Sequence, residues 1–280
     1  MENGITIGEK LPTFADWLRS EDKSAGTIEK YLRDVAAFAA WLGARELTKE
    51  TGAEWREHLT AEAYAPVTVN SMLAAVNTYC VFSGLNIRVR FLKVQRKVFR
   101  EQARELTRGE YEKLIETALM TGKERLALLM ETICASGIRV SEVKYITVEA
   151  VRCGRATVSL KGKVRSILLP GKLCRKLRKY AEKQKIASGE IFLTGSGRSL
   201  SRRQIWAEMK RLCEKAGVEA SKVFPHNLRH LFATTFYRIY KDIVRLADVL
   251  GHSSVDTTRI YLLTTGEEHQ RQLEKMGLVS

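Results

Sequence analysis

Residues 225–261 read PHNLRHLFATTFYRIYKDIVRLADVLGHSSVDTTRIY and hold three of the five histidines of the chain. Pro225 predicts the start of a helix, because its fixed φ suits the first helical position. His226 and Arg229 follow three residues apart, so that both side chains project from one face of that helix. The stretch therefore predicts a helix that presents an imidazole beside a guanidinium.

The second half of this stretch predicts a turn that brings a histidine and a tyrosine together. Gly251 is typical of a helix end, and His252 follows it directly. A new helix that begins at Ser253 or Ser254 would carry Tyr261 back toward this histidine. Two imidazoles, a guanidinium and a phenol match neither a metal site nor a serine or cysteine triad. They suit a nucleophilic tyrosine that attacks a phosphodiester, with arginine on the non-bridging oxygens and histidines that donate to them or move protons.

Three separated motifs carry a resemblance. They are H-x-L-R-H at residues 226–230, L-G-H-S-S-x-x-T-T-x-x-Y at residues 250–261, and SGIRVSE at residues 136–142. Together they resemble the tyrosine recombinase, or integrase, family, and the third motif places Arg139 where the family carries a further arginine. The resemblance implies a site-specific DNA recombinase or integrase that cuts and rejoins strands through a covalent 3′-phosphotyrosine intermediate and a Holliday junction. It also implies that four protomers assemble as a tetramer on two DNA sites.

The resemblance and the chemistry together suggest a role for each site residue. Arg139 and Arg229 would hold the non-bridging oxygens, where two planar guanidiniums bind better than lysines could. Tyr261 would attack, although a phenol with a pKa of about 10 needs neighbours that activate it. His226 would take the proton of the tyrosine, and His252 would donate a hydrogen bond to the phosphate.

A lysine completes the set that the resemblance implies. Two strand-like runs, 156–160 and 166–169, are joined by the basic turn KGKVR. The family carries its catalytic lysine on a hairpin at this point, where Lys161 matches and would protonate the leaving 5′-oxygen. Lys163 is the alternative, because Pro170 arrives one residue later than the family pattern would have it.

Two further residues lie close to the motifs in sequence. Glu142 follows Arg139 by three residues, and we expect it to orient an active-site side chain. His230 is expected to pack in the core. The sequence offers no carboxylate cluster for Mg²⁺ and no Walker lysine loop, and a phosphotyrosine bond keeps the energy of the broken phosphodiester. We therefore expect no cofactor, no metal and no ATP.

The charge of the chain is unevenly spread. Lysine and arginine number 47 against 32 aspartates and glutamates, so that the formal net charge is +15. Residues 1–90 hold 10 basic and 12 acidic residues, whereas residues 91–280 hold 37 basic and 20 acidic residues. The excess accompanies the catalytic motifs, as binding to the phosphates of double-stranded DNA would require.

The cysteines and the apolar segments suggest where the protein works. Five cysteines are an odd number without C-x-x-C spacing, which argues against disulfides and structural zinc and favours a reducing cytoplasm. The N-terminus shows no charged segment followed by an apolar run, and no stretch approaches the roughly eighteen apolar residues of a membrane span. We therefore expect neither export nor contact with a membrane.

At 280 residues the chain is long enough for two domains. Residues 1–87 predict four short helices, similar to the SAM-like core-binding domain with which the family clamps one side of DNA. Residues 88–106, RVRFLKVQRKVFREQAREL, form a basic linker that we expect to contact phosphates. Residues 107–280 would form the catalytic domain, with a C-terminal tail that packs on a neighbouring protomer in the family. The expected fold is mainly α with a small β-sheet (α+β).

Capping signals predict individual helix boundaries. Thr13 is expected to cap the first helix, and residues 51–54 and 107–110 have the spacing of capping boxes. Helix ends are expected at Gly137 and Gly217.

Two other functions compete with recombination. A DNA-binding protein of the same fold that has lost catalysis would be favoured by a substitution among the six site residues, and none is substituted. A topoisomerase IB-like enzyme that relaxes DNA as a monomer would share the tyrosine chemistry without needing the tail. Because the helical segments begin near residue 1, the sequence favours a Xer-like or small mobile-element recombinase over a phage integrase with an arm-binding module.

Overall fold

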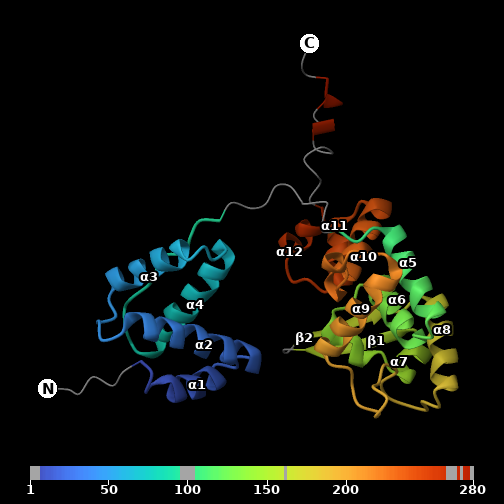
Figure 1. Cartoon of the computed structure of the whole chain (residues 1–280), viewed down its shortest axis with the longest axis horizontal. Coiled ribbons are helices and arrows are strands. Elements are labelled where there is room, and N and C mark those ends of the chain that lie inside the picture. Colours follow the sequence, from blue (N-terminus) through green and yellow to red (C-terminus); the bar gives the residue numbers. More distant parts are fainter. Residues whose placement is uncertain (1–6, 95–104, 161–162, 263–269, 272–273, 278–280) are drawn as a thin grey trace. The chain divides into compact units, whose positions relative to one another are not determined.

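The structure of the chain is a computed structural model. The residues that it describes are 7–94, 105–160, 163–262, 270–271 and 274–277. The chain divides into two compact units, residues 1–96 and 97–280. Among the described residues the architecture is mainly helical with one two-stranded sheet (Figure 1), which confirms the predicted fold class. No helix in this part of the chain is both long and apolar enough to cross a bilayer.

Several predicted features fall outside the described residues. Lys161 does so, together with its neighbour Gly162. The same holds for residues 95–104 of the basic linker and for most of the tail beyond Leu262.

The N-terminal unit contains the four helices that the sequence predicts. They are α1 Leu11–Ser20, α2 Ala25–Leu42, α3 Lys49–Ala61 and α4 Pro66–Phe82. Two of the predicted caps are wrong. α1 begins before Thr13, whose hydroxyl donates to the Lys10 carbonyl instead of capping the helix. α3 is capped by Thr48, and Thr51 takes the third helical position of that capping box, so the predicted box was wrong by three residues.

Residues 88–92 are fastened along α4 and are called the strap below. The Val89 N–H donates to Asn77 Oδ1 at 2.8 Å, and Asn77 Nδ2 donates to the Val89 carbonyl at 3.0 Å. Asn70 forms the same pair of bonds with the backbone of Leu92, at 2.7 and 2.9 Å. Two asparagine side chains thus act as a neighbouring strand would, by satisfying both polar groups of an extended residue.

The strap fixes which side chains face outward. Val89 is 3 % exposed, and an added Cβ on Gly52 of α3 would lie 2.5 Å from its Cγ2. Successive side chains of an extended chain alternate in direction, so that Arg88 and Arg90 are exposed on either side of this buried valine. The first residues of the predicted linker therefore pack as part of the N-terminal unit.

The second unit, residues 97–280, is called the catalytic unit below after its predicted role. It contains the other elements of the described residues, of which those named η are 3₁₀ helices. In chain order they are α5 Arg108–Met120, α6 Glu124–Ser136, η2 Val140–Tyr145, α7 Val148–Cys153, β1 Arg155–Leu160, β2 Lys163–Leu168, α8 Gly171–Lys183, α9 Arg202–Ala216, η3 Ala220–Lys222, α10 Pro225–Tyr240, α11 Ile243–Leu250, α12 Val255–Arg259 and η4 Ile260–Leu262. The predicted capping box at Thr107 and Glu110 is confirmed at the start of α5. Gly137 and Gly217 both adopt the left-handed conformation and end α6 and α9, as predicted.

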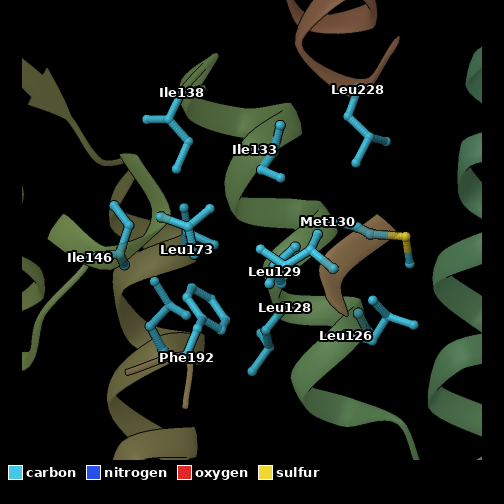
Figure 2. Packing of buried hydrophobic residues seen from close by; sticks show 14 of the residues in the cluster. Leu126, Leu128, Leu129, Met130, Ile133, Ile138, Ile146, Leu173, Phe192 and Leu228 are labelled. Carbon is cyan, nitrogen blue, oxygen red and sulfur yellow. The ribbon is translucent and has the colours of Figure 1, made fainter. Parts of the chain in front are cut away.

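α6 lies in the middle of the core of this unit. Its Leu129, Met130 and Ile133 are at most 1 % exposed. Figure 2 shows these side chains among those of other elements, with Leu228 of α10 and Leu173 of α8 beside them. Because apolar burial holds α6 in place, the turn at its C-terminal end is held in place too. This turn forms part of the polar site described below.

The predicted hairpin is also confirmed. β1 and β2 pair antiparallel, with Val158 opposite Arg165 and Leu160 opposite Lys163. One face of the hairpin is packed on the core, where Val158 is 2 % and Ile167 is 3 % exposed. In sequence, residues 161 and 162 separate the two strands, and they lie outside the described residues.

The strap yields a first prediction. Asn77→Ala removes both bonds to Val89 and leaves a partly buried N–H and carbonyl unpaired, so that the free energy of unfolding of the N-terminal unit should fall by about 1–3 kcal/mol. Hydrogen–deuterium exchange at the Val89 amide should become faster. Asn86→Ala, which removes an exposed amide three residues before Val89, is the matched control and should change neither quantity. Equal exchange in the two variants would contradict the role of Asn77.

Candidate active site

Arg229 lies at the centre of the candidate site. Pro225 stands in the first turn of α10, as predicted, and Arg229 follows one turn later with 2 % of its surface exposed. Its Nη1 donates to the Gly137 carbonyl at 2.6 Å, and its Nη2 donates to the Leu250 carbonyl at 2.9 Å. These carbonyls stand at the C-terminal ends of α6 and α11, where a helix carries partial negative charge. Two helix ends therefore hold the buried guanidinium.

His252 lies directly beyond α11. The helix ends as predicted, with Gly251 in the left-handed conformation at φ 62°. His252 Nε2 is 2.9 Å from Arg229 Nη2, and its Nδ1 is 2.8 Å from Thr258 Oγ1. A guanidinium can only donate, so Nε2 accepts this bond. The proton of the neutral imidazole is then on Nδ1, which donates to Thr258.

Burial, together with the positive charge around it, keeps the imidazole of His252 neutral. Burial lowers the pKa of His252 from 6.5 to about 4, and the charges of Arg229, Arg139 and Arg165 act in the same direction. Burial and the charge of Arg139 also lower the pKa of Arg229, whereas a hydrogen bond to Tyr261 raises it. A guanidinium remains protonated in proteins nevertheless. The site therefore combines fixed positive charge with a neutral imidazole.

Tyr261 returns to His252, in agreement with the predicted turn. Ser254 caps α12, and the short helix η4 that follows carries Tyr261. The tyrosine ring stacks on the His252 ring, with 6.0 Å between centroids and 12° between planes. The exposed His226 has its ring centroid 6.2 Å from that of Tyr261. His230 is buried, as expected, and packs edge-on against the tyrosine ring at 4.9 Å.

Glu142 joins two arginines from different elements. It is 1 % exposed, and its Oε1 accepts from Arg139 Nη1 at 3.0 Å while its Oε2 accepts from the Arg139 backbone N–H at 2.7 Å. Arg165 of β2 reaches the same carboxylate, with Nη2 2.5 Å from Oε2. Arg139 also donates to the Gly251 carbonyl at 3.4 Å, and its side chain is 41 % exposed. Glu142 thus orients Arg139, as its expected role requires, and Arg139 is the arginine through which the cluster opens to solvent.

Most of the predicted site residues come together in this way. Lys161 lies outside the described residues, and Lys163 begins β2. The five others are brought together from α10, from η4 and from the turns that follow α6 and α11: Arg139, His226, Arg229, His252 and Tyr261. Among the residues that the structure describes, no group of three His, Cys, Asp or Glu side chains is placed to hold a metal ion.

Two site residues escaped the sequence analysis. Thr258 fixes the tautomer of His252, and its signal was its place within the LGHSSxxTTxxY motif. Arg165 shares the carboxylate of Glu142. Its signal was the alternation of β2, since a charge stands there at an inward-facing position two residues before the buried Ile167.

Comparison with known proteins gives the family. The phage integrase family model matches residues 104–268, and the model of the phage integrase N-terminal SAM-like domain matches residues 11–83. Tyrosine recombinase XerA of Thermococcus kodakarensis is 32 % identical over 279 residues, which cover 97 % of this chain and 96 % of that protein. Tyrosine recombinase XerC of Roseiflexus castenholzii is 30 % identical, with 91 % and 88 % covered. The chain therefore belongs to the phage integrase family. Within that family it is a tyrosine recombinase, an enzyme of site-specific DNA recombination.

Solved structures share the fold. XerH site-specific recombinase bound to difH substrate, in a pre-cleavage complex, matches with a TM-score of 0.70 at 18 % identity and covers 97 % of this chain and 84 % of that one. A lambda integrase tetramer bound to a Holliday junction matches with a TM-score of 0.72 at 19 % identity, with 93 % and 78 % covered. At these identities the likeness establishes the arrangement of the elements.

The state of His252 yields a second prediction. Its pKa is about 4 in the folded chain against an ordinary 6.5, so the unfolded chain binds the proton first as the pH falls. The contribution of His252 to the free energy of unfolding is therefore fully present above pH 6.5 and is lost as the pH falls toward 4. Chemical unfolding of wild type and His252→Gln between these pH values should give a steeper loss of stability for the wild type. Parallel curves would contradict a neutral His252, and NMR titration of its imidazole would locate the pKa directly.

Proposed function

We propose that this tyrosine recombinase cuts and rejoins double-stranded DNA through a covalent 3′-phosphotyrosine intermediate, with Tyr261 as the nucleophile. The observation that carries the proposal is the contact of Tyr261 and His252 with the buried guanidinium of Arg229. Burying a charge costs several kcal/mol unless its partners offset that cost. A planar guanidinium can bind the oxygens of a phosphate, and a phenol beside it can attack the phosphorus.

Cleavage would follow an in-line attack. The Tyr261 oxygen forms a bond to phosphorus while the bond from phosphorus to the 5′-oxygen breaks, which leaves the 3′-phosphoryl group on the tyrosine. The phenol loses its proton to a base, for which His226 is the candidate because it is exposed and lies beside the tyrosine ring. The departing oxygen gains a proton and becomes a 5′-hydroxyl. A 5′-hydroxyl of the partner strand can then reverse these steps, so that rejoining needs neither ATP nor a metal ion.

The two arginines would bind the charge that develops on phosphorus. The transition state carries more negative charge on the non-bridging oxygens than the ground state does, and fixed guanidiniums stabilise that difference. Arg139 is suited to meet the phosphate first, because its side chain is 41 % exposed. Arg229 is 2 % exposed and held by two helix ends, so its fork is oriented before DNA arrives.

His252 would change protonation state as DNA binds. Without DNA its Nε2 accepts from Arg229, which leaves this nitrogen without a proton to donate. A phosphate anion in the site would favour the imidazolium, since an opposite charge nearby stabilises the charged form. His252 could then donate from Nε2 to a non-bridging oxygen while Thr258 keeps the ring in place.

The hairpin turn would supply the general acid. Lys161 is the proposed donor to the 5′-oxygen, and Lys163 is the alternative. Support for this assignment comes from the paired strands β1 and β2, because Lys161 follows the last residue of β1 and Lys163 is the first residue of β2. A lysine on a short hairpin can approach a groove of DNA without moving the rest of the unit.

The partner would be double-stranded DNA, gripped by residues 1–87, the basic linker 88–106 and the catalytic unit 107–280. On the N-terminal unit four basic side chains line two surface pockets: Lys49, Arg56, Arg88 and Arg90. Basic side chains grouped in this way suit phosphates and carry no base information by themselves. By analogy with the lambda integrase tetramer on a Holliday junction, four protomers would act on two DNA sites. The C-terminal tail of each protomer would pack on a neighbouring protomer.

The nucleophile can be tested directly. Tyr261→Phe removes only the attacking oxygen, so DNA affinity should persist while the covalent adduct is abolished. A suicide substrate with a nick near the cleavage point should trap the wild type as a slow band on a denaturing gel. The matched control is Tyr240→Phe, which alters a 56 % exposed tyrosine of α10 and should leave the band intact.

Two outcomes of that experiment would overturn the proposal. One is a band that persists in Tyr261→Phe, which would place the nucleophile elsewhere. The other is a wild-type band that disappears in excess EDTA and returns with Mg²⁺, which would show that the chemistry depends on a metal ion.

The general acid is tested by changing the leaving group. Lys161→Ala should slow cleavage of an ordinary phosphodiester by about 10²- to 10⁴-fold, the range of a positioned acid. A bridging 5′-phosphorothiolate has a leaving sulfur that needs no proton, so that this substrate should restore the rate. Lys163→Ala is the paired variant and should show neither effect. Rescue of Lys163→Ala alone would assign the acid to Lys163, and rescue of neither variant would leave His226 as the candidate.

A further inference from the structure

Arg165 occupies a position in β2 that belongs to the core. On the opposite face of β2, Val164 and Leu168 are 70 % and 76 % exposed, whereas Ile167, on the same face as Arg165, is 3 % exposed. The period of two along a strand therefore points the Arg165 side chain inward. It is 16 % exposed, so the position would suit an apolar residue if packing were the only requirement.

The guanidinium of Arg165 connects three elements. From β2 it reaches the buried carboxylate of Glu142 in η2 at 2.5 Å, and its Nη1 donates to the Val249 carbonyl near the end of α11 at 3.3 Å. The same carboxylate holds Arg139. The hairpin is thus tied to one catalytic arginine through Glu142, and to the turn before His252 through α11.

Gly251 makes room for this connection. An added Cβ at residue 251 would lie 2.6 Å from Nη1 and 3.1 Å from Nε of Arg165. Gly251 also has a φ of +62°, which a side chain tolerates poorly. Gly217 has a φ of +61°, but nothing lies within 4 Å of its added Cβ. A side chain at residue 217 would therefore add backbone strain alone, whereas a side chain at residue 251 would add strain and a collision with Arg165.

We propose that Arg165 is a positioning residue for strand transfer, which fastens the β1–β2 hairpin to the C-terminal end of α11, directly before His252. This inference rests on the proposed function and adds a residue to it. The shared carboxylate has a second consequence. Because Glu142 is neutralised by Arg165 as well as by Arg139, the cluster keeps a net positive charge for the phosphate.

An ion pair that served only stability would respond to mutation differently from a positioning residue. Its loss would lower stability and leave the rate of the bound complex unchanged. Loss of a direct DNA contact would instead lower the DNA affinity by as much as it lowers the rate. Loss of a positioning residue slows the reaction of protein already bound to DNA, since a misplacement of about 1 Å in a reacting group can cost about 10²-fold in rate.

The test measures single-turnover formation of the covalent adduct on the nicked suicide substrate at saturating protein, together with DNA affinity. Arg165→Ala should slow adduct formation by about 10²-fold, with affinity changed much less. Arg165→Lys should not restore the rate, because one ammonium cannot bind Glu142 and the Val249 carbonyl in the manner of a fork. Arg155→Ala alters an exposed arginine of β1 in the same hairpin and should retain the wild-type rate.

Gly251 supplies an independent arm. Gly251→Ala should slow adduct formation as Arg165→Ala does, while Gly217→Ala should not, because it adds only the strain of a positive φ. The double variant Arg165→Ala with Gly251→Ala should be no slower than the slower single variant, because both changes break one contact. The comparison of Gly251→Ala with Gly217→Ala does not use Arg165→Ala, so it remains decisive even if that variant does not fold, and equal rates for these two glycine variants would overturn the inference.

The outcomes are distinct. Additive losses in the double variant would overturn the inference, and so would equal rates for Arg165→Ala and Arg155→Ala, or a fall in affinity as large as the fall in rate. A wild type that forms no adduct at all would overturn the proposed function instead.

Discussion

The buried guanidinium of Arg229 is the constraint on which the catalytic unit depends. A desolvated charge needs partners on all sides, and here they are backbone carbonyls at two helix ends, Gly137 after α6 and Leu250 at the end of α11. Three successive carbonyls at the end of α11 accept from three arginines: Val249 from Arg165, Leu250 from Arg229 and Gly251 from Arg139. The end of one short helix therefore gathers three like charges that would otherwise repel one another.

The chemistry of the site follows from this cluster of three arginines. The positive charges add to burial in keeping His252 neutral, so its Nε2 is an acceptor until an anion arrives. Glu142 is the buried carboxylate among these arginines, and it is shared between Arg139 and Arg165. A site of this kind is organised before its substrate binds, which is how fixed dipoles and charges stabilise a transition state without rearrangement.

Local signals in the sequence located most of the fold and much of the candidate site. Pro225, Gly137 and Gly251 mark helix boundaries by their backbone preferences alone, and each boundary is where the sequence predicted it. The cap of α3 was misplaced because Thr48 and Thr51 are both good capping residues, and the choice between them depends on where the chain arrives from α2. Arg165 and Thr258 were missed because their partners are distant in sequence or lie off the spacing of a single helix.

The sequence by itself determined the helices, the hairpin, the two-part organisation and the identity of the chemical groups, because propensities, caps and hydrophobic periods act over a few residues. The tertiary structure alone decided how those groups meet. Arg229 lies 92 residues from its acceptor Gly137, and Arg165 lies 23 residues from Glu142. No local preference specifies such pairs. They form because apolar burial packs α10 against α6 in one cluster and against α11 in another, which brings the C-terminal ends of α6 and α11 together. The backbone carbonyls left unpaired at these ends accept hydrogen bonds from side chains elsewhere in the chain.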